Sequence, residues 1–287
     1  MIETECAVDA GDIPDTVRAA NHRVLQEQSI LAACRICKGR TQFCFTNRLL
    51  AKYDVSYHVC DRCGFLQTER PYWLDEAYAD AIAAEDVDLV GRNLRMMRIL
   101  TCVLPVLFDR DARVLDLAGG YGLLTRLMRN NGLAFSWSDK FCANLFAKEF
   151  AWKDGDGPIA AVTAFEVLEH LEDPLEFIRD ALNISSTRTL IFTTQLYERV
   201  PPQPGKWNYY AADAGQHIAF YQPRTLAYIA RLLSVNFYSS NGIHFLTGCK
   251  LRPTLLWMLS GKLSYIFYFA SRLALELKIA TPKLLRA

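Results

Sequence analysis

The segment Val114–Gly122, VLDLAGGYG, constrains the fold of this chain more than any other feature. An apolar, strand-like run ends in a group of glycines, and a helical pattern follows near Leu123–Asn130. Glycine suits such a turn because its backbone takes conformations closed to residues with a Cβ and because it lets the chain approach a ligand closely. The segment therefore predicts a strand, a tight turn and a helix that together bind an adenosine cofactor.

Two carboxylates flank this turn. Asp116 ends the strand, and Asp139 follows the next apolar run, Ala134–Ser138, near the roughly 20-residue spacing at which a second-strand acid binds ribose hydroxyls. The glycines do not follow the GxGxxG order of dinucleotide sites, and a carboxylate at position 116 suits a cationic group better than a pyrophosphate. The pattern favours S-adenosylmethionine, which carries a sulfonium and an ammonium, over NAD. Glycines that serve packing alone are the alternative.

Strand-like and helical segments alternate along the rest of the chain. Further strands are predicted near Phe135–Trp137, Ile159–Phe165, Thr189–Thr193, Val235–Ser239 and Ile243–Leu246, and helices near Trp73–Ala84, Val87–Leu107, Asn144–Phe150 and Thr225–Leu233. Asp173, Pro174 and Glu176 form a start signal for another helix. This alternation predicts an α/β fold with a doubly wound, Rossmann-like sheet.

Four of the nine cysteines form two CxxC pairs, Cys34 with Cys37 and Cys60 with Cys63. Each CxxC turn presents two thiolates, and two such turns complete a closed tetrahedral site without a position for catalytic water. The spacing predicts a structural zinc ion, Zn2+, with short strands around QFCF and VSYHV. Buried free thiols or a redox pair are the alternatives.

The composition of the chain limits where the protein is expected to be located and which partners it is expected to bind. Hydrophobic residues make up 51% of the 287 residues, enough for a sizeable core, and the formal net charge of +1 gives no general attraction to nucleic acid. The first residues, MIETECAVDAGDIPDTV, lack the basic and apolar segments of an export signal. We therefore expect a cytoplasmic protein that acts on a small molecule and not on nucleic acid.

The C-terminal segment Thr254–Lys278 is apolar and aromatic, but Lys262 and Arg272 interrupt it. No run of about 18 uncharged residues is left for a membrane-spanning helix. We expect a helix or helical hairpin packed on the core or on a second subunit. A helix lying peripherally at the inner membrane surface is the alternative.

Three motifs in order resemble the class I S-adenosylmethionine-dependent methyltransferases with an N-terminal zinc-binding module. They are the CxxC pairs, DLAGGYG, and AFEVLEHLEDP at Ala164–Pro174. The resemblance covers residues 34–250 and is to sugar-tailoring enzymes of the nucleotide-sugar C-methyltransferase type. It implies cofactor-binding roles for Asp116, Gly119, Gly120, Gly122, Asp139 and Glu166. Position 118 is alanine where that family usually has glycine. His170 is expected to be structural, tying the start of the next helix, and a metal-binding role is the alternative.

We expect the chain to divide into five segments. These are an N-terminal arm at 1–33, a zinc-binding module at 34–70, a helical connector at 71–110, an S-adenosylmethionine-binding methyltransferase domain at 111–250 and an apolar helical tail at 251–287.

The segment Gly215–Tyr221, GQHIAFY, carries the expected chemistry. In the resembled C-methyltransferases the comparable segment reads HEH and its last histidine transfers a proton, a position that matches His217. Gln216 replaces the glutamate, and an expected downstream glycine pair is absent. These departures from the resembled pattern weaken C-methylation and leave O-methylation of a sugar or glycan-linked hydroxyl, with His217 as general base. A buried structural histidine beside IAFY is the alternative.

Four residues are expected to bind the acceptor, namely Tyr78, Trp207, Tyr210 and Gln216. Aromatic rings suit a sugar face, although the same rings serve equally well as loop anchors. Two other functions stay open at this point. One is C-methylation of a nucleotide-keto-sugar, and the other is a noncatalytic zinc-bearing scaffold.

Overall fold

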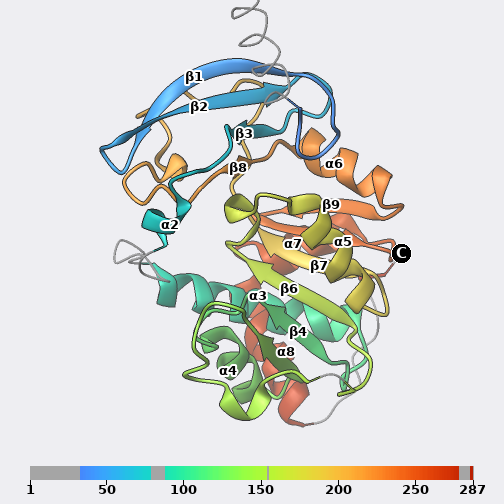
Figure 1. The fold of residues 1–287 in the computed structure, drawn as a ribbon. Helices are drawn as coiled ribbons and strands as arrows, with labels where there is room; N and C mark the ends of the chain where they lie inside the picture. The colour runs from blue at the N-terminus through green and yellow to red at the C-terminus, as the bar shows by residue number, and fades with distance from the viewer. Residues whose placement is uncertain (1–32, 79–87, 154, 278–284, 287) are drawn as a thin grey trace, which may run out of the picture.

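The computed structural model describes residues 33–78, 88–153, 155–277 and 285–286, and these residues form two sheets (Figure 1). Residues 1–32 of the expected N-terminal arm lie outside the described residues, as do residues 79–84 of the first predicted helix. Only Leu74–Ala77 of that helix, α2, is helical in the described part.

Within the described ranges, the larger sheet has six strands in the order β5-β4-β6-β7-β10-β9. The strands are β4 (Val114–Leu117), β5 (Phe135–Ser138), β6 (Ala161–Phe165), β7 (Thr189–Thr193), β9 (Asn236–Ser240) and β10 (Ile243–Thr247). The first four in sheet order are parallel, whereas β10 runs antiparallel to β7 and to β9. The alternation of strands and helices along the sequence therefore predicted the sheet correctly.

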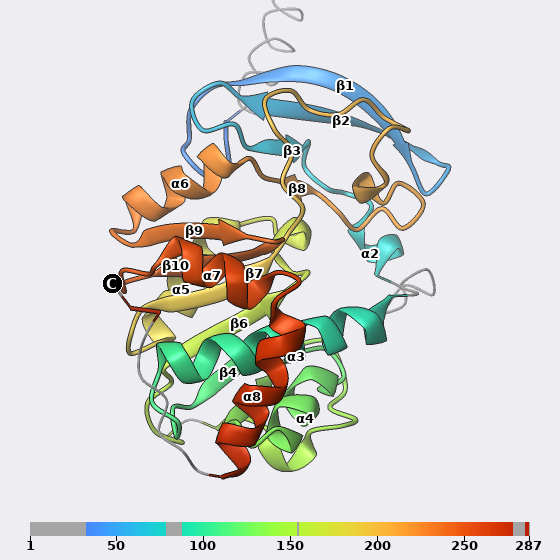
Figure 2. The ribbon, with the colours of Figure 1, turned by 180° about the vertical axis from the view of Figure 1, so that it is seen from behind.

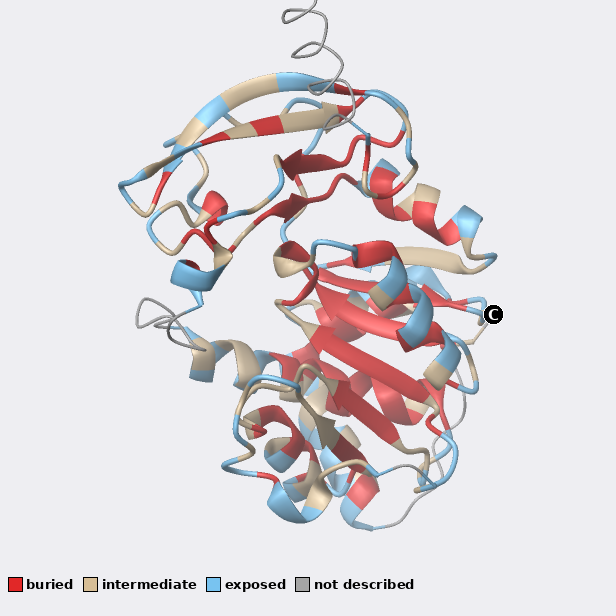
Figure 3. Ribbon diagram, in the orientation of Figure 1, coloured by how far each residue is buried: buried red, intermediate tan, exposed pale blue. Residues whose placement is uncertain are grey.

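Helices cover both faces of this sheet (Figures 1 and 2). They are α3 (Leu89–Leu107), α4 (Leu123–Asn130), α5 (Pro174–Ile184), α6 (Pro223–Leu232), α7 (Pro253–Ser260) and α8 (Ser264–Glu276). Successive strand residues point to opposite faces, so Val114 packs in the core with α3, α4, α7 and α8, while Leu115 packs in the core with α5 and α6. The strands are mostly buried on both faces as a result (Figure 3).

The helix predicted near Asn144–Phe150 is wrong, because only Lys148–Phe150 forms a single 3-10 turn there. The Asn144 side chain accepts from the N–H of Ala147 at 2.8 Å and donates to the Ala147 carbonyl at 3.0 Å. The N–H groups of Leu145 and Phe146 bond to the Tyr121 carbonyl instead of to a helix. Asparagine competes in this way with the helical hydrogen-bond pattern.

The smaller, antiparallel sheet brings distant parts of the chain together. It contains β1 (Thr41–Leu49), β2 (Tyr53–Cys60), β3 (Leu66–Thr68) and β8 (Ala219–Phe220). In its last pairing, Leu66 of β3 lies opposite Phe220 of β8. The segment that carries His217 is therefore attached to the sheet that follows the first CxxC pair.

The apolar tail forms two helices, α7 and α8, which pack against α3 (Figure 2). Leu256, Leu259 and Leu275 are its main buried residues in the core beneath these helices. Among the described residues, no helix has both the length and the apolar character needed to cross a membrane.

Candidate functional site

The glycine turn after β4 has the strained backbone that its sequence suggests. Ala118, Gly120 and Gly122 all have positive φ, at 55°, 54° and 85°. A Cβ on Gly119 would lie 2.8 Å from Asp116 Oδ2 and 2.9 Å from Trp137 Cδ1. Glycine is therefore favoured at 119 by space and at 120 and 122 by conformation, and Ala118 takes the same left-handed region as Gly120 at some cost in free energy.

Asp116 lies beneath this turn and is only 2% exposed. Thr163 donates to its Oδ1 at 2.9 Å, and Thr125 donates to its Oδ2 at 3.2 Å. Burial raises the pKa of Asp116 to about 6, although both hydrogen bonds oppose the shift. The carboxyl group thus joins β4, β6 and α4 below the glycines.

Asp139 links the glycine turn to the loop after β5. Its Oδ2 accepts from the N–H of Gly120 at 2.9 Å, and its Oδ1 accepts from Phe141 and Cys142 at 2.7 and 2.8 Å. A carboxylate offers about four lone-pair directions, so these three bonds leave acceptor capacity on Asp139. The two predicted carboxylates therefore both adjoin the turn, Asp116 next to Gly119 and Asp139 through the N–H of Gly120.

Glu166 directly follows β6, the strand next to β4, and has a positive φ of 54°. The Thr193 hydroxyl donates to Glu166 Oε1 at 2.7 Å, and the Glu166 N–H donates to the same hydroxyl at 3.0 Å. Strained residues at adjacent strand ends, Ala118 and Glu166, mark the carboxyl edge at which open α/β sheets bind ligands.

Beyond Glu166, three side chains converge: Glu169, His170 and His217. Their nearest ligand atoms all lie within 4.8 Å of one another, and the two imidazole rings meet edge to face with centroids 4.7 Å apart. His217 Nδ1 lies 2.6 Å from the Tyr209 carbonyl, which can only accept, so Nδ1 carries the proton and Nε2 keeps a lone pair in the neutral ring. Burial lowers the pKa of His217 and favours that neutral form.

Glu169 is fully buried at 0% exposure. Burial raises its pKa to about 8, and the nearby Glu166 carboxylate adds to the effect. The Tyr209 hydroxyl is close to this carboxyl group and shares a hydrogen bond with Thr194 Oγ1 at 3.0 Å. His170 Nδ1 lies 3.0 Å from the Tyr78 hydroxyl and 3.2 Å from the Gln216 carbonyl.

A methyltransferase domain model matches residues 91–233, which contain the glycine turn, Asp139, Glu166 and His217. The match spans just under half of the chain and identifies a methyltransferase domain within it. This finding confirms the predicted enzyme class.

Several solved methyltransferases have similar folds. An O-methyltransferase family 2 protein from Planctomyces limnophilus, in complex with apigenin, is 14% identical, with 56% of this chain and 58% of that chain covered and a TM-score of 0.41. An O-methyltransferase family protein from Burkholderia thailandensis is 16% identical, with coverages of 61% and 66% and a TM-score of 0.37. A Synechocystis magnesium protoporphyrin IX methyltransferase with bound S-adenosylmethionine is 13% identical, with coverages of 61% and 90% and a TM-score of 0.35.

The chain spans about three fifths of the length of the first of these proteins. No curated protein matches the sequence of this methyltransferase.

The predicted acceptor-binding residues of the methyltransferase lie in two environments. Tyr78 reaches His170, and Gln216 is 9% exposed and donates to the Ala77 carbonyl at 2.7 Å. Tyr210 is 2% exposed, packs against Tyr57 and Phe220, and donates to the Pro202 carbonyl at 2.6 Å. Its packing favours the anchoring alternative over stacking on a ligand.

Trp207 belongs to the same aromatic group, with its ring 5.0 Å from Tyr210 and 5.7 Å from Phe220 between centroids. Its Nε1 donates to Gln195 Oε1 at 3.2 Å. The predicted loop aromatics thus fill the core of the smaller sheet, and the histidine cluster forms beside them through Tyr209.

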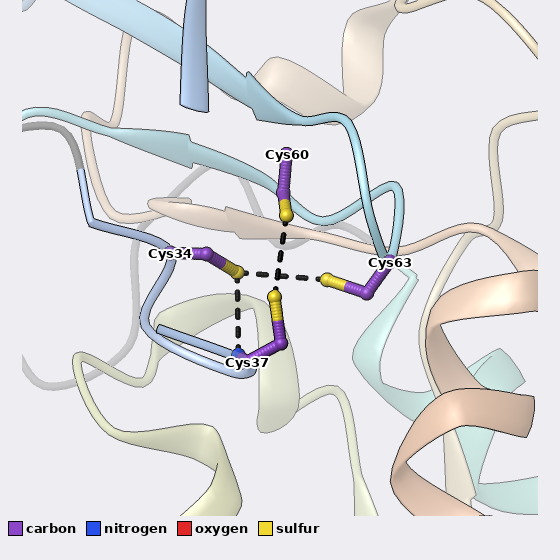
Figure 4. A group of neighbouring side chains, drawn as sticks. All are labelled: Cys34, Cys37, Cys60 and Cys63. Carbon is purple, nitrogen blue, oxygen red and sulfur yellow. Dashed lines mark hydrogen bonds between the residues drawn. The ribbon is translucent and has the colours of Figure 1, made fainter. Parts of the chain in front are cut away.

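The four predicted cysteines converge at one point (Figure 4). Cys34 Sγ lies 3.5 Å from Cys63 Sγ, and Cys37 Sγ lies 3.3 Å from Cys60 Sγ, with all four free of disulfides. Cys34, Cys60 and Cys63 are buried. The hydrogen bond from Cys63 lowers the pKa of Cys34 to about 5, so the cluster stabilises a thiolate. Thiolates in this arrangement can hold a metal ion.

One residue of the cluster around His217, Glu169, was not named from the sequence, and Tyr209 was named only as a ring that could stack on a sugar. Glu169 lies in the AFEVLEHLEDP segment that was singled out, and an acid next to a histidine just after a strand was the available signal. Tyr209 lies between the two loop aromatics that were chosen, but its contribution is a backbone carbonyl that orients His217, which side-chain chemistry does not reveal.

Proposed function

We propose that this methyltransferase moves the methyl group of S-adenosylmethionine to a hydroxyl of a sugar or glycan-linked acceptor, with His217 as general base. The observation that carries the proposal is the Nδ1 contact of His217 with the Tyr209 carbonyl at 2.6 Å. That contact leaves Nε2 as the proton-accepting atom, and burial keeps the ring neutral. The reacting hydroxyl would lie against Nε2, in line with the sulfonium methyl.

In this proposal the cofactor occupies the carboxyl ends of β4, β5 and β6. Gly119, Gly120 and Gly122 let the backbone approach it, and Asp139 meets the ribose hydroxyls with its remaining lone pairs. Glu166 lies on the neighbouring strand end and carries a negative charge toward the cationic methionine portion. Asp116 supports the turn from below, because both of its oxygens already accept from threonines.

The proposed acceptor side is formed by Tyr78 and the segment Gln216–His217, next to the loop that contains Trp207 and Tyr210. Support comes from the placement of Tyr78 and Gln216 around His170, which adjoins His217. Tyr210 and Trp207 would act indirectly, by holding Tyr209 and therefore the His217 ring.

The test is methyl transfer measured as S-adenosylhomocysteine release with a panel of free, nucleotide-linked and lipid-linked sugars. His217→Asn should reduce turnover, while His58→Asn, which changes a histidine in β2, should not. Transfer to a hydroxyl leaves no deuterium on the acceptor carbons in D2O, whereas washing of deuterium into a carbon before transfer would indicate C-methylation instead.

We also propose that Cys34, Cys37, Cys60 and Cys63 hold structural zinc. A tetrahedral Zn2+ with Zn–S bonds of about 2.3 Å places its sulfurs about 3.8 Å apart, close to the Sγ distances of 3.3 and 3.5 Å. The zinc would stabilise residues 34–70 as a module on residues 111–250, joined by the connector at 71–110. Metal analysis of the purified protein tests this directly.

The tail at 251–287 has an exposed apolar stripe that could contact another surface. Ile266, Phe269, Leu273 and Leu277 recur at helical spacing along α8 and its end and are 54–73% exposed. We propose that residues 254–278 use this stripe against a second subunit or, peripherally, against a membrane surface. Sedimentation equilibrium and co-sedimentation with anionic vesicles separate the two.

A further inference from the structure

The environment of Glu169 is unusual for a carboxyl group. Its side chain is 0% exposed, and neither carboxylate oxygen has a hydrogen bond of normal geometry within the described structure. Nearby Tyr209 directs its hydroxyl to Thr194. Burying an uncompensated carboxylate costs several kcal/mol, so such a group either keeps its proton or meets a cation.

Two imidazoles lie at the distance that a cation would need. One nitrogen of His170, one nitrogen of His217 and one oxygen of Glu169 are mutually within 4.8 Å. A metal ion with bonds of about 2.1 Å holds neighbouring ligand atoms about 3 to 3.5 Å apart, so small side-chain rotations would close the set. Backbone contacts hold the histidine segment in place, because the Ile218 N–H donates to the Glu169 carbonyl at 2.8 Å.

Second contacts orient both rings in the way that metal-binding histidines require. His217 Nδ1 donates to the Tyr209 carbonyl, which leaves Nε2 for a metal. The Tyr78 hydroxyl and the Gln216 carbonyl flank Nδ1 of His170. Glu166 adds a second negative charge close to Glu169, which increases the attraction for a cation.

We propose that Glu169, His170 and His217 form a divalent metal site, separate from the four-cysteine cluster, that takes a transition ion such as Mn²⁺, Fe²⁺ or Zn²⁺. Two imidazoles and one carboxylate suit these ions and leave coordination positions open. Because the cluster lies at the proposed acceptor side, the fourth ligand would be a hydroxyl of the acceptor. Metal binding is argued from the geometry alone, whereas activation of the acceptor hydroxyl by the metal rests on the proposed methyl transfer.

When a cation is bound, His217 is a metal ligand and no longer accepts the proton. The cation lowers the pKa of the bound hydroxyl, whose proton passes to solvent water. The resulting alkoxide oxygen forms a bond to the methyl carbon while the carbon–sulfur bond breaks. The electron pair of that bond stays on sulfur, so the products are the methyl ether and S-adenosylhomocysteine.

The experiment titrates the full-length protein with Mn²⁺ and follows free Mn²⁺ by electron paramagnetic resonance, without S-adenosylmethionine or acceptor. Mn²⁺ is chosen because it avoids thiolate sites, so the cysteine cluster does not compete. We expect one equivalent to bind to wild type and affinity to fall at least about tenfold in Glu169→Gln. The matched control, Glu172→Gln, changes an exposed acid of the same segment and should bind as wild type does.

A second readout covers the case in which Glu169→Gln does not fold. Bound Mn²⁺ in wild type should show nitrogen couplings from two imidazoles in pulsed resonance spectra. Each of three results would overturn the proposal. The wild type could bind no Mn²⁺ or Zn²⁺ beyond the cysteine cluster, it could show no such nitrogen couplings, or a folded Glu169→Gln protein could bind Mn²⁺ with unchanged affinity.

Methyl transfer is measured separately in the presence of a chelator, with retention of cysteine-bound zinc checked by elemental analysis. Loss of transfer that Mn²⁺ restores supports the metal role. Transfer that persists without the second metal overturns that role and leaves His217 as the base. Intact Mn²⁺ binding with no transfer to any hydroxyl would count against the proposed function alone.

Discussion

The carboxylate of Asp139 accepts a hydrogen bond from the backbone N–H of Gly120 at 2.9 Å. The acid after the second strand of the methyltransferase fold and the glycine turn after the first are therefore one connected unit. Because Asp139 also accepts from Phe141 and Cys142, it sets the positions of two loops at the edge where the cofactor is expected.

Asp139→Ala should weaken S-adenosylmethionine binding at least tenfold, because the proposed ribose contact and three backbone hydrogen bonds would be lost together. Isothermal titration calorimetry of cofactor binding measures the effect. Glu149→Ala, an exposed acid near the same turn, is the matched control and should bind normally. Equal affinity of Asp139→Ala and wild type would contradict the assigned cofactor site.

His217→Ala should lower kcat by about 10²- to 10⁴-fold and leave the Kd for S-adenosylmethionine within about twofold, because its Nε2 serves the acceptor and not the cofactor. Steady-state kinetics and cofactor titration check the two quantities separately. Full turnover in the variant would remove His217 from the chemistry.

If the four cysteines hold zinc as proposed, Cys37→Ser should release it and destabilise the smaller sheet, since the metal would join the turns around Cys34 and Cys60. Elemental analysis gives the zinc content, and hydrogen exchange should increase in β1–β3 and in β8, which pairs with β3. Cys44→Ser, a cysteine outside the cluster, should retain zinc. A stable wild-type protein purified without metal would defeat this prediction.

Asp116→Asn should change how stability depends on pH. Burial raises the pKa of Asp116 from 3.8 to about 6, so over this range the unfolded chain releases its proton before the folded chain does. Stability of wild type therefore falls with rising pH between about pH 4 and pH 6, by up to about 3 kcal/mol from this group. Chemical denaturation at several pH values should find that fall reduced in the variant. If the free energy of unfolding depended on pH in the same way in both proteins, a raised pKa for Asp116 would be refuted.

Ala118→Gly should stabilise the protein by about 0.5 to 1 kcal/mol. The alanine has a φ of 55°, a region that costs residues with a Cβ about 1 to 2 kcal/mol, and the added entropy of an unfolded glycine offsets part of the gain. Thermal unfolding measures the change. Ala147→Gly, a buried alanine whose Cβ packs near Gly122, should be destabilised in the same assay.

Much of the larger sheet was predictable because its signals are local. The helix at Leu123–Asn130 was predicted with its observed ends, and Asp173 caps α5 through the Glu176 N–H at 3.1 Å. The 144–150 segment failed because a side chain bonded to its own backbone and the glycine turn competed for its N–H groups. The hydrophobic periodicity of the sequence gives no sign of such competing hydrogen bonds.

The site was predictable in its residue types and less so in its contacts. His217 and the cysteines were named from spacing and resemblance, and the described structure brings the four cysteines together. Tyr210 was expected to face an acceptor, yet its ring packs between Tyr57 and Phe220. An aromatic residue in a loop has the same sequence pattern whether it meets a ligand or a neighbouring sheet.

The sequence by itself determined the α/β architecture, the glycine turn with its two acids and the pairing of the CxxC motifs, because each depends on neighbours along the chain or on a fixed residue spacing. Only the tertiary structure decided that β8 pairs with β3 and that Glu169 is buried beside His170 and His217. The strand pairing joins residues about 150 positions apart, and the approach of Glu169 to His217 joins residues about 50 positions apart. Both arise from tertiary packing, for which no local sequence pattern carries the information.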